Sequence, residues 1–532
     1  MGNERIARAV RSRVLSATLA CAALLCACTS RGSSPAGDVG NDAPRPDGVE
    51  LSAPGAVALQ TEASLVVTVV RNGNAAAPAS VAYATENGTA VAGRDFQAAK
   101  GTLSWAAGDA AAKRVEIPLV ATAPFAGARS FSVRLSSATG VPLGAQSLAT
   151  ASIGGSSLAI RVKGNRLVDG SGNVVQLRGV NVSGLETVSV QGWAPNNPWG
   201  GQTGDPTPNW GAMASWGINA VRIPLNETSW LGRPCIDAGG ASANSSPGRT
   251  INPDPSGSYR AAVQEAVDAA TAKGYYVILD LHWTAPGKFC AMAQNAMADA
   301  DNSPVFWSQL ASAYGGYPNV ILEPFNEPYF DGLSRSKAWS GLMSGTTRPS
   351  FATGGKPAQF PLEWNTVGMQ SLVDTIRGTG ARNVIIVSGL DYAKDLGRWL
   401  SNRPQDPMNQ LGAVWHAYPA FNTRFGTPQY EQPNYAPGIW SDIQDILAAG
   451  IPVVITEFGD HDVPGTVGAP FVSKLLPWAD ANGASYLGWT WDKWGNPDNV
   501  LIKDAAGTPT DGYGVYVKAH YLCRAANSGN CR

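Results

Sequence analysis

Two glutamates each follow a short apolar run. Glu327 closes the run over residues 319–327, and Glu457 closes the run over residues 451–457. Apolar runs of this length that end in turn residues are typical of buried strands in a parallel sheet. Two carboxylates that converge on one pocket are what glycoside hydrolysis requires, one to donate a proton and one to attack or to activate water. The pattern therefore predicts that chemistry, provided that the fold brings the two strand ends together.

Other polar and aromatic residues stand at the ends of similar runs. Taken in chain order, these candidate supporting or substrate-binding residues are Arg222, His282, Asn326, His416, Tyr418, Trp489 and Trp491. Either histidine alone would more often be structural than catalytic. Together with the two glutamates, the set indicates a polar pocket whose walls come from many different strands.

The segment from residue 158 alternates strand-like runs with amphipathic stretches such as 259–273 and 364–378. The runs end near Asn181, Pro224, His282, Glu327, Ser388, Tyr418, Glu457 and Trp489. Eight strand–helix units predict an α/β fold of the (β/α)8 TIM barrel type. Active sites of such barrels lie at the carboxyl ends of the strands, where these candidates fall.

The same residues carry a family resemblance. Asn326-Glu327-Pro328 at the fourth run, 456–459 (Thr-Glu-Phe-Gly) at the seventh, and the opening segment 164–181 resemble glycoside hydrolase family 5, and endoglucanases in particular. The resemblance covers residues 158–521, within an expected catalytic domain of residues 158–532. It implies a retaining mechanism without a cofactor or metal.

The resemblance also implies roles for the individual side chains. Glu327 would be the acid/base and Glu457 the nucleophile, with Arg222 and Tyr418 orienting Glu457. Asn326 would bond the 2-hydroxyl of the sugar. His282 and His416 would bond hydroxyls or the acid/base, and Trp489 and Trp491 would stack on sugar rings.

Residues 51–155 show period-two alternation with turn residues between short runs, as in 65–70 and 130–135. This pattern predicts an all-β, immunoglobulin-like sandwich. Residues 83–90, 93–96 and 101–105 resemble the Calx-β family. Because residues 123–129 lack the acidic cluster of its calcium-binding members, we expect a spacer or interaction module without calcium.

The first 28 residues read as a bacterial lipoprotein signal. Arginines precede a short apolar stretch, which ends in Leu25-Cys26-Ala27-Cys28. Cys28 would be the lipidated first residue, although an ordinary secretory signal cut nearby is the alternative. Residues 29–50, rich in Ser, Gly, Pro and Asp, predict a flexible linker. The chain is therefore expected to be exported, and anchored to the cell envelope by lipid or secreted.

Four cysteines remain after such a signal. Cys523 and Cys531 are close in sequence and are expected to join, which leaves Cys235 for Cys290 in an oxidising compartment. The spacing of these cysteines does not resemble a zinc site.

The composition narrows the class of partner. A formal net charge of −1 over 532 residues argues against nucleic acid, since phosphate binding needs a basic face. The chain has 17 tryptophans, whose flat rings can pack a core or face sugar rings. We expect a monomeric endo-acting hydrolase of β-1,4-glucan. The alternatives are a β-mannanase, a xyloglucanase or an exo-β-glucosidase, or a non-catalytic carbohydrate-binding surface lipoprotein.

Overall fold

The computed structural model describes most of the chain beyond residue 46. The described ranges are 47–191, 197–199, 208–238, 246–330, 332–348, 363–418, 436–460, 469–493, 499–526 and residue 531. The expected signal, Cys28 and all but the end of the expected linker lie outside them. Within the described ranges, every helix is too short or too polar to cross a membrane.

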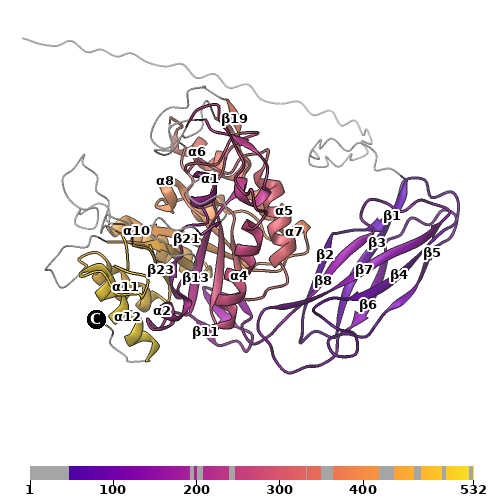
Figure 1. The fold of residues 1–532 in the computed structure, drawn as a ribbon, viewed down its shortest axis with the longest axis horizontal. Helices are drawn as coiled ribbons and strands as arrows, with labels where there is room; N and C mark the ends of the chain where they lie inside the picture. The colour runs from indigo at the N-terminus through magenta and orange to yellow at the C-terminus, as the bar shows by residue number, and fades with distance from the viewer. Residues whose placement is uncertain are drawn as a thin grey trace, which may run out of the picture. The chain divides into compact units, whose positions relative to one another are not determined.

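The N-terminal part is a sandwich of two sheets (Figure 1). One sheet has the order β1-β3-β6, and the other has the order β2-β8-β7-β4-β5. The strands are β1 (Gly48–Leu51), β2 (Gly55–Leu59), β3 (Ser64–Asn72), β4 (Ala79–Asn87), β5 (Lys100–Trp105), β6 (Lys113–Pro118), β7 (Ala128–Thr139) and β8 (Leu148–Gly154). This architecture confirms the predicted all-β domain.

The sandwich starts earlier than the composition indicated. Val49 and Leu51 are buried in its core, so β1 occupies positions 48–50, which had been expected to belong to the linker. Strict alternation along β3 sends one face of the strand inward. Between the sheets, the rings of Phe96 and Phe131 stack with centroids 3.9 Å apart. Asp95 is buried, accepts a hydrogen bond from the backbone N–H of Val91, and contacts Arg94 and Arg129 through its two oxygens.

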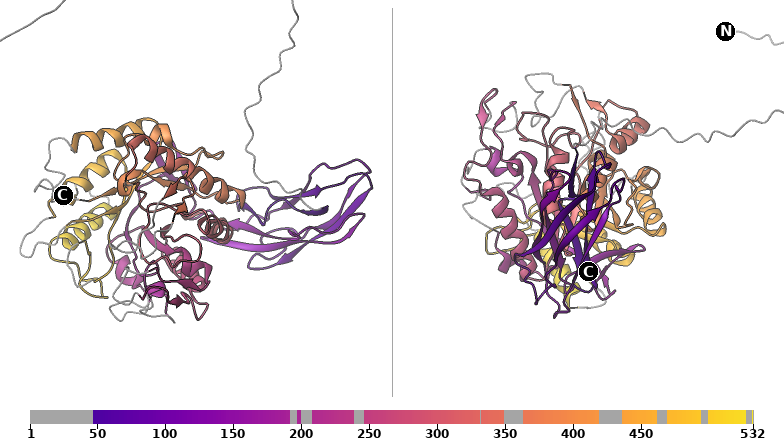
Figure 2. Two further views of the ribbon diagram at one scale, coloured as in Figure 1. Left: turned by 90° about the horizontal axis from the view of Figure 1, so that it is seen from above. Right: turned by 90° about the vertical axis from the view of Figure 1, so that its right-hand side faces the viewer.

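The C-terminal part is a closed barrel of eight parallel strands, which confirms the predicted fold. The strands are β12 (Arg178–Asn181), β13 (Ala220–Asn226), β16 (Tyr276–Trp283), β17 (Val320–Glu323), β20 (Ile385–Ser388), β21 (Leu411–Ala417), β22 (Val453–Phe458) and β23 (Ser485–Gly488). Helices form an outer layer around them (Figure 2). The longest are α4 (Tyr259–Ala272), α5 (Ser303–Tyr314), α6 (Arg335–Ser344), α7 (Met369–Gly378), α10 (Ala436–Ala448), α11 (Val472–Asn482) and α12 (Tyr513–Ala525).

One expected helix is shorter at its start. The amphipathic stretch 364–378 was expected to be one segment, but α7 begins only at Met369. Trp364–Asn365 forms β19 instead, which pairs with β18 (Thr347–Arg348). Trp364 is buried in a small cluster with Ala238 and Ala296, and this packing outweighs local helix preference.

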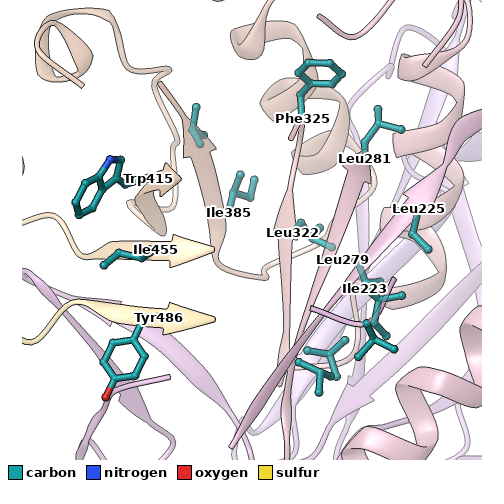
Figure 3. Close-up of a cluster of buried hydrophobic side chains, with 14 of the residues drawn as sticks. Ile223, Leu225, Leu279, Leu281, Leu322, Phe325, Ile385, Trp415, Ile455 and Tyr486 are labelled. Atoms are coloured by element: carbon teal, nitrogen blue, oxygen red, sulfur yellow. The ribbon is translucent and has the colours of Figure 1, made fainter. Parts of the chain in front are cut away.

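Alternation along the barrel strands separates two environments. Residues such as Ile223, Leu279 and Ile455 belong to the large cluster that packs the helices on the barrel (Figure 3). The alternate positions face the barrel interior. Nearer the start of the strands they form a second apolar cluster, which includes Ile278, Ile321, Ile386, Val414 and Val454. Two residues further along their strands, Asp280 and Glu323 continue the same inward parity, so polar groups occupy the upper barrel interior.

Two β-bulges modify this alternation near the strand ends. Between β21 and β22, Trp415 pairs with Ile455 but His416 pairs with Glu457, so Thr456 is an extra residue. Between β13 and β16, His282 is extra in the same way. A bulge re-aims the side chains around it and is common beside active sites. Here it lets the consecutive residues Thr456 and Glu457 both contact interior groups.

Two disulfides join segments that lie outside the barrel strands. Cys235, in β14 (Cys235–Ile236), is bonded to Cys290 in the loop after β16, and Cys523 in α12 is bonded to Cys531. The first bond closes a separation of 55 residues and the second a separation of 8 residues. The longer bridge holds the β16 loop, which also carries a contact to Glu327 described below.

Candidate active site

Arg222 on β13 is the centre of the polar barrel interior. Its guanidinium is fully buried and donates in several directions. Nε and Nη2 reach the two oxygens of Glu323 at 2.7 and 3.2 Å, and Nη1 reaches Glu457 Oε1 at 2.7 Å. Nη2 also lies 2.8 Å from Asn326 Oδ1 and 2.9 Å from Asp280 Oδ2. One rigid cation therefore fixes side chains from four other parts of the barrel.

Two of these carboxyls, Asp280 and Glu323, are fully buried below the site. Burial raises the pKa of each to about 8, while the charge of Arg222 opposes that rise. Buried charges need partners because they have lost their hydration. Asp280 and Glu323 are therefore joined inside the barrel through Arg222.

Glu457, near the end of β22, is held at both carboxylate oxygens. Arg222 Nη1 donates to Oε1, and the hydroxyl of Tyr418 donates to Oε2 at 2.7 Å. The side chain is 6% exposed, so only a small part of it faces solvent. Donors on both sides fix the orientation of a carboxylate and stabilise its charge. This environment suits a group that must attack as an anion.

Glu327 lies four residues beyond the end of β17 rather than on the strand. The connecting segment is rigid: Trp307 Nε1 donates to the carbonyl of Pro324, and the hydroxyl of Ser388 donates to the carbonyls of Phe325 and Asn326. The prediction that this glutamate marks a strand end is therefore wrong by one short turn. The segment nevertheless brings its side chain to the same edge of the barrel.

The carboxyl of Glu327 is in a different environment from that of Glu457. Its Oε1 lies 2.8 Å from His416 Nδ1, and Gln294 Nε2 donates to its Oε2 at 2.9 Å. Burial raises the pKa of Glu327, and the hydrogen bond from Gln294 lowers it in part. With 16% of its side chain exposed, Glu327 is more open than Glu457. A carboxyl that keeps its proton to higher pH suits a general acid.

The two glutamates are close together. Glu327, His416 and Glu457 each offer an atom such that all three atoms lie within 4.8 Å of one another. These are also the atoms that would have to bind a metal ion. The oxygens of both glutamates are already engaged by His416, Gln294, Tyr418 and Arg222, so the group forms a hydrogen-bonded network.

His282, Asn326 and Trp489 form one wall of the site. His282 Nδ1 lies 2.6 Å from Asp280 Oδ2, and its Nε2 lies 3.3 Å from Asn326 Nδ2. The ring of Trp489 is parallel to that of His282, with centroids 5.6 Å apart. Trp489 is partly exposed and so retains surface for a ligand. Burial lowers the pKa of His282, which favours a neutral ring.

Trp491 does not belong to this wall. Its side chain is 6% exposed and packs edge-on against Trp216, with ring centroids 5.0 Å apart, inside the large hydrophobic cluster. The family resemblance had implied that Trp491, like Trp489, would stack on a sugar ring. However, the chain turns after β23 ends at Gly488, so strand parity no longer applies there.

Three polar contacts were missed by the sequence reasoning. Gln294 in the β16 loop binds Glu327, Thr456 binds His416, and Asn181 accepts from Arg222 Nη1 at 3.0 Å. Gln294 lies in a loop without periodicity and has no signal of its own. Asn181 had been noted as a strand end, and polarity there was the signal that could have identified it.

Comparisons with known proteins agree with this geometry. The family model described as cellulase (glycosyl hydrolase family 5) matches residues 168–495, and the Calx-beta domain model matches residues 45–154. Since the first model covers more than half of the chain, the protein belongs to glycosyl hydrolase family 5.

Individual relatives are distant. Endoglucanase N of Pectobacterium atrosepticum is 27% identical, over 62% of this chain and 56% of its own length. A mannan endo-1,4-beta-mannosidase of Streptomyces lividans is 22% identical, over 65% of this chain and 68% of its own. A hyperthermophilic endocellulase structure from Pyrococcus horikoshii is 21% identical with a TM-score of 0.48, covering 69% of this chain and 98% of that one. The chain spans about half the length of the first curated relatives it matches.

Proposed function

We propose that this protein is a retaining glycoside hydrolase in which Glu457 is the nucleophile and Glu327 is the acid/base. The observation that carries the proposal is the contrast between two neighbouring carboxyls. Arg222 and Tyr418 hold Glu457 as an oriented acceptor of hydrogen bonds, whereas burial raises the pKa of Glu327. Two carboxyls whose environments differ in this way can divide acid and nucleophile roles between them.

The proposed reaction has two displacements. Glu457 attacks the anomeric carbon while Glu327 protonates the departing glycosidic oxygen, so the sugar becomes an ester of Glu457. Glu327, now a carboxylate, then takes a proton from water as the water oxygen attacks the anomeric carbon. The ester bond breaks, Glu457 leaves as a carboxylate, and both side chains return to their starting states.

The separation of the glutamates supports retention of configuration. Retaining enzymes place the two carboxyls about 5 Å apart, whereas inverting enzymes leave roughly 6.5–9.5 Å for a water molecule. The atoms that Glu327 and Glu457 contribute to their shared group with His416 lie within 4.8 Å. That spacing favours direct attack by Glu457.

For the substrate we propose β-1,4-glucan, cleaved internally. The support is the name endoglucanase carried by the first relatives and the partly exposed Trp489 ring beside the glutamates. Aromatic rings provide flat apolar surfaces of the kind that sugar rings stack on. A β-mannan is the second candidate, because one relative carries the name mannan endo-1,4-beta-mannosidase.

A substrate panel tests this proposal. We expect carboxymethyl-cellulose to lose viscosity early, while few reducing ends have formed, because internal cuts shorten chains quickly. Faster cleavage of β-mannan or of xyloglucan would instead assign that polysaccharide as the substrate. Early release of single sugars would indicate exo action. Binding without hydrolysis of any β-glycan would instead support the carbohydrate-binding alternative and contradict an enzyme.

We also propose that Cys28 carries the lipid that anchors the protein to the cell envelope. The support is the Leu25-Cys26-Ala27-Cys28 sequence after a short apolar stretch. Labelling of the full chain with radioactive palmitate is expected in the producing bacterium and should be absent from Cys28→Ser. Equal labelling of both proteins would contradict the anchor.

A further inference from the structure

A chain of hydrogen bonds runs from Glu327 into the barrel interior and ends at Glu323. Glu327 Oε1 lies 2.8 Å from His416 Nδ1, and His416 Nε2 lies 3.0 Å from Thr456 Oγ1. Thr456 Oγ1 in turn lies 3.2 Å from Glu323 Oε1. His416, Thr456 and Glu323 are fully buried, so beyond Glu327 the chain is shielded from solvent.

The histidine can carry only one ring hydrogen in this position. Burial lowers the pKa of His416 to about 3, so the ring is neutral near pH 7. A neutral imidazole donates from one nitrogen and accepts at the other, and the threonine hydroxyl has a single hydrogen. The chain therefore has two possible directions, one with the hydrogen on Nε2 and one with the hydrogen on Nδ1.

The contacts of Glu323 favour one direction. Both of its oxygens accept from Arg222, at 2.7 and 3.2 Å, and this fork suits an ionised carboxylate. An ionised Glu323 can only accept from Thr456. Burial acts the other way by raising the pKa of Glu323 to about 8, and a protonated Glu323 would reverse the chain. The two directions predict opposite experimental outcomes.

We propose that Thr456 is a positioning residue. Its hydroxyl donates to Glu323 and accepts from Nε2–H of His416, which leaves Nδ1 free of hydrogen, so that Nδ1 accepts a hydrogen bond from the protonated carboxyl of Glu327. The inference rests on the proposed role of Glu327 as the acid. Thr456 has the same inward parity as Val454, and the β-bulge turns Glu457 inward beside it. We call this chain from Glu327 through His416 and Thr456 to Glu323 the relay. It stabilises the protonated form of Glu327 while the His416 ring stays neutral.

Other charged or titratable groups also face Glu327 and His416. They come from several elements and are Arg222, Asp280, His282, Lys394, Tyr418 and Glu457. Glu457 Oε2 approaches His416 Nδ1 to 3.5 Å. All six residues are unchanged when Thr456 alone is replaced, so a matched pair of threonine variants isolates the hydroxyl.

The first arm of the test is the pH profile of kcat/KM. In Thr456→Val, His416 loses its acceptor at Nε2, the hydrogen moves to Nδ1, and Nδ1–H donates to the Glu327 carboxylate. That bond stabilises the carboxylate form of Glu327 and lowers its pKa. The basic limb of the profile is therefore expected to move to lower pH by about one pH unit. Thr456→Ser keeps the hydroxyl and is expected to keep the native limb. Thermal unfolding shows whether both variants are folded.

The second arm of the test determines the tautomer of His416 by NMR and needs no activity measurement. The full chain is labelled with ¹⁵N-histidine, and the signals of His416 among the 4 histidines are those missing from His416→Gln. We expect the Nε2–H form in the native protein and the Nδ1–H form in Thr456→Val. An unchanged or raised basic limb in that variant, or Nδ1–H in the native protein, overturns the relay. A native protein inactive on every β-glycan would refute the proposed function, while the tautomer would still test the relay.

Discussion

Replacing Glu457 by alanine is expected to lower kcat on a β-glycan by roughly 10⁴-fold or more, because no group then remains to form the covalent intermediate. Oligosaccharide binding should persist, since His282, Asn326 and Trp489 keep their places. Initial rates from reducing ends, together with calorimetric binding of a cello-oligosaccharide, measure the two effects separately.

Rescue of this variant by azide would identify Glu457 specifically as the nucleophile. In Glu457→Ala, a small anion can enter the space of the lost carboxylate and attack from the same face, which gives an α-glycosyl azide from a β-linked substrate. Glu265→Ala is a suitable control, because Glu265 lies exposed on α4. If Glu457→Ala retained most of its turnover, Glu457 could not be the nucleophile.

Replacing Glu327 by alanine is expected to have an effect that depends on the leaving group. Positioned general acids contribute roughly 10²–10⁴-fold, and we expect polysaccharide cleavage to fall within that range. A β-glycoside of 2,4-dinitrophenol needs no proton to depart, so its first displacement should be almost unaffected. Burst kinetics with that substrate would show accumulation of the glycosyl-enzyme, because the second displacement has lost its base.

The same variant also tests the pH dependence. The pKa of Glu327 is raised by burial, so the native enzyme is expected to lose activity as pH rises through that pKa and the acid gives up its proton. Glu327→Ala should therefore lack the basic limb, and azide should rescue it to a β-glycosyl azide. Equal losses on the polysaccharide and on the dinitrophenyl substrate, with the basic limb intact, would exclude Glu327 as the acid.

The barrel and the two glutamates could be predicted because their signals are local. Apolar runs of strand length recur with helical stretches between them, and parallel strands of a barrel end at one edge. Arg222 could be predicted for the same reason, since it lies within such a run. That one arginine would bind both Asp280 and Glu323 could not be predicted, because the contact depends on side chains from three strands.

Thr456 illustrates a physical limit of sequence reasoning. In a regular strand, adjacent residues face opposite sides, so Thr456 and Glu457 should not both face the barrel interior. A bulge breaks that alternation. The bulge arises from the pairing of β22 with β21, so the sequence of β22 alone does not reveal it. The prediction for Trp491 was wrong for a related reason, because this residue lies beyond the end of its strand. Gln294 depends on a loop whose position is fixed partly by the distant Cys235–Cys290 bond.

The stereochemistry of the first product tests the central claim most directly. If Glu457 attacks the anomeric carbon and water then displaces it, two inversions give net retention. Proton NMR of a β-glucan oligosaccharide during its first minutes of cleavage should show the β-anomer of the new reducing end, followed by slow mutarotation to the α-anomer. An α-anomer that appears first would mean a single displacement by water and would contradict the assignment of Glu457 as nucleophile.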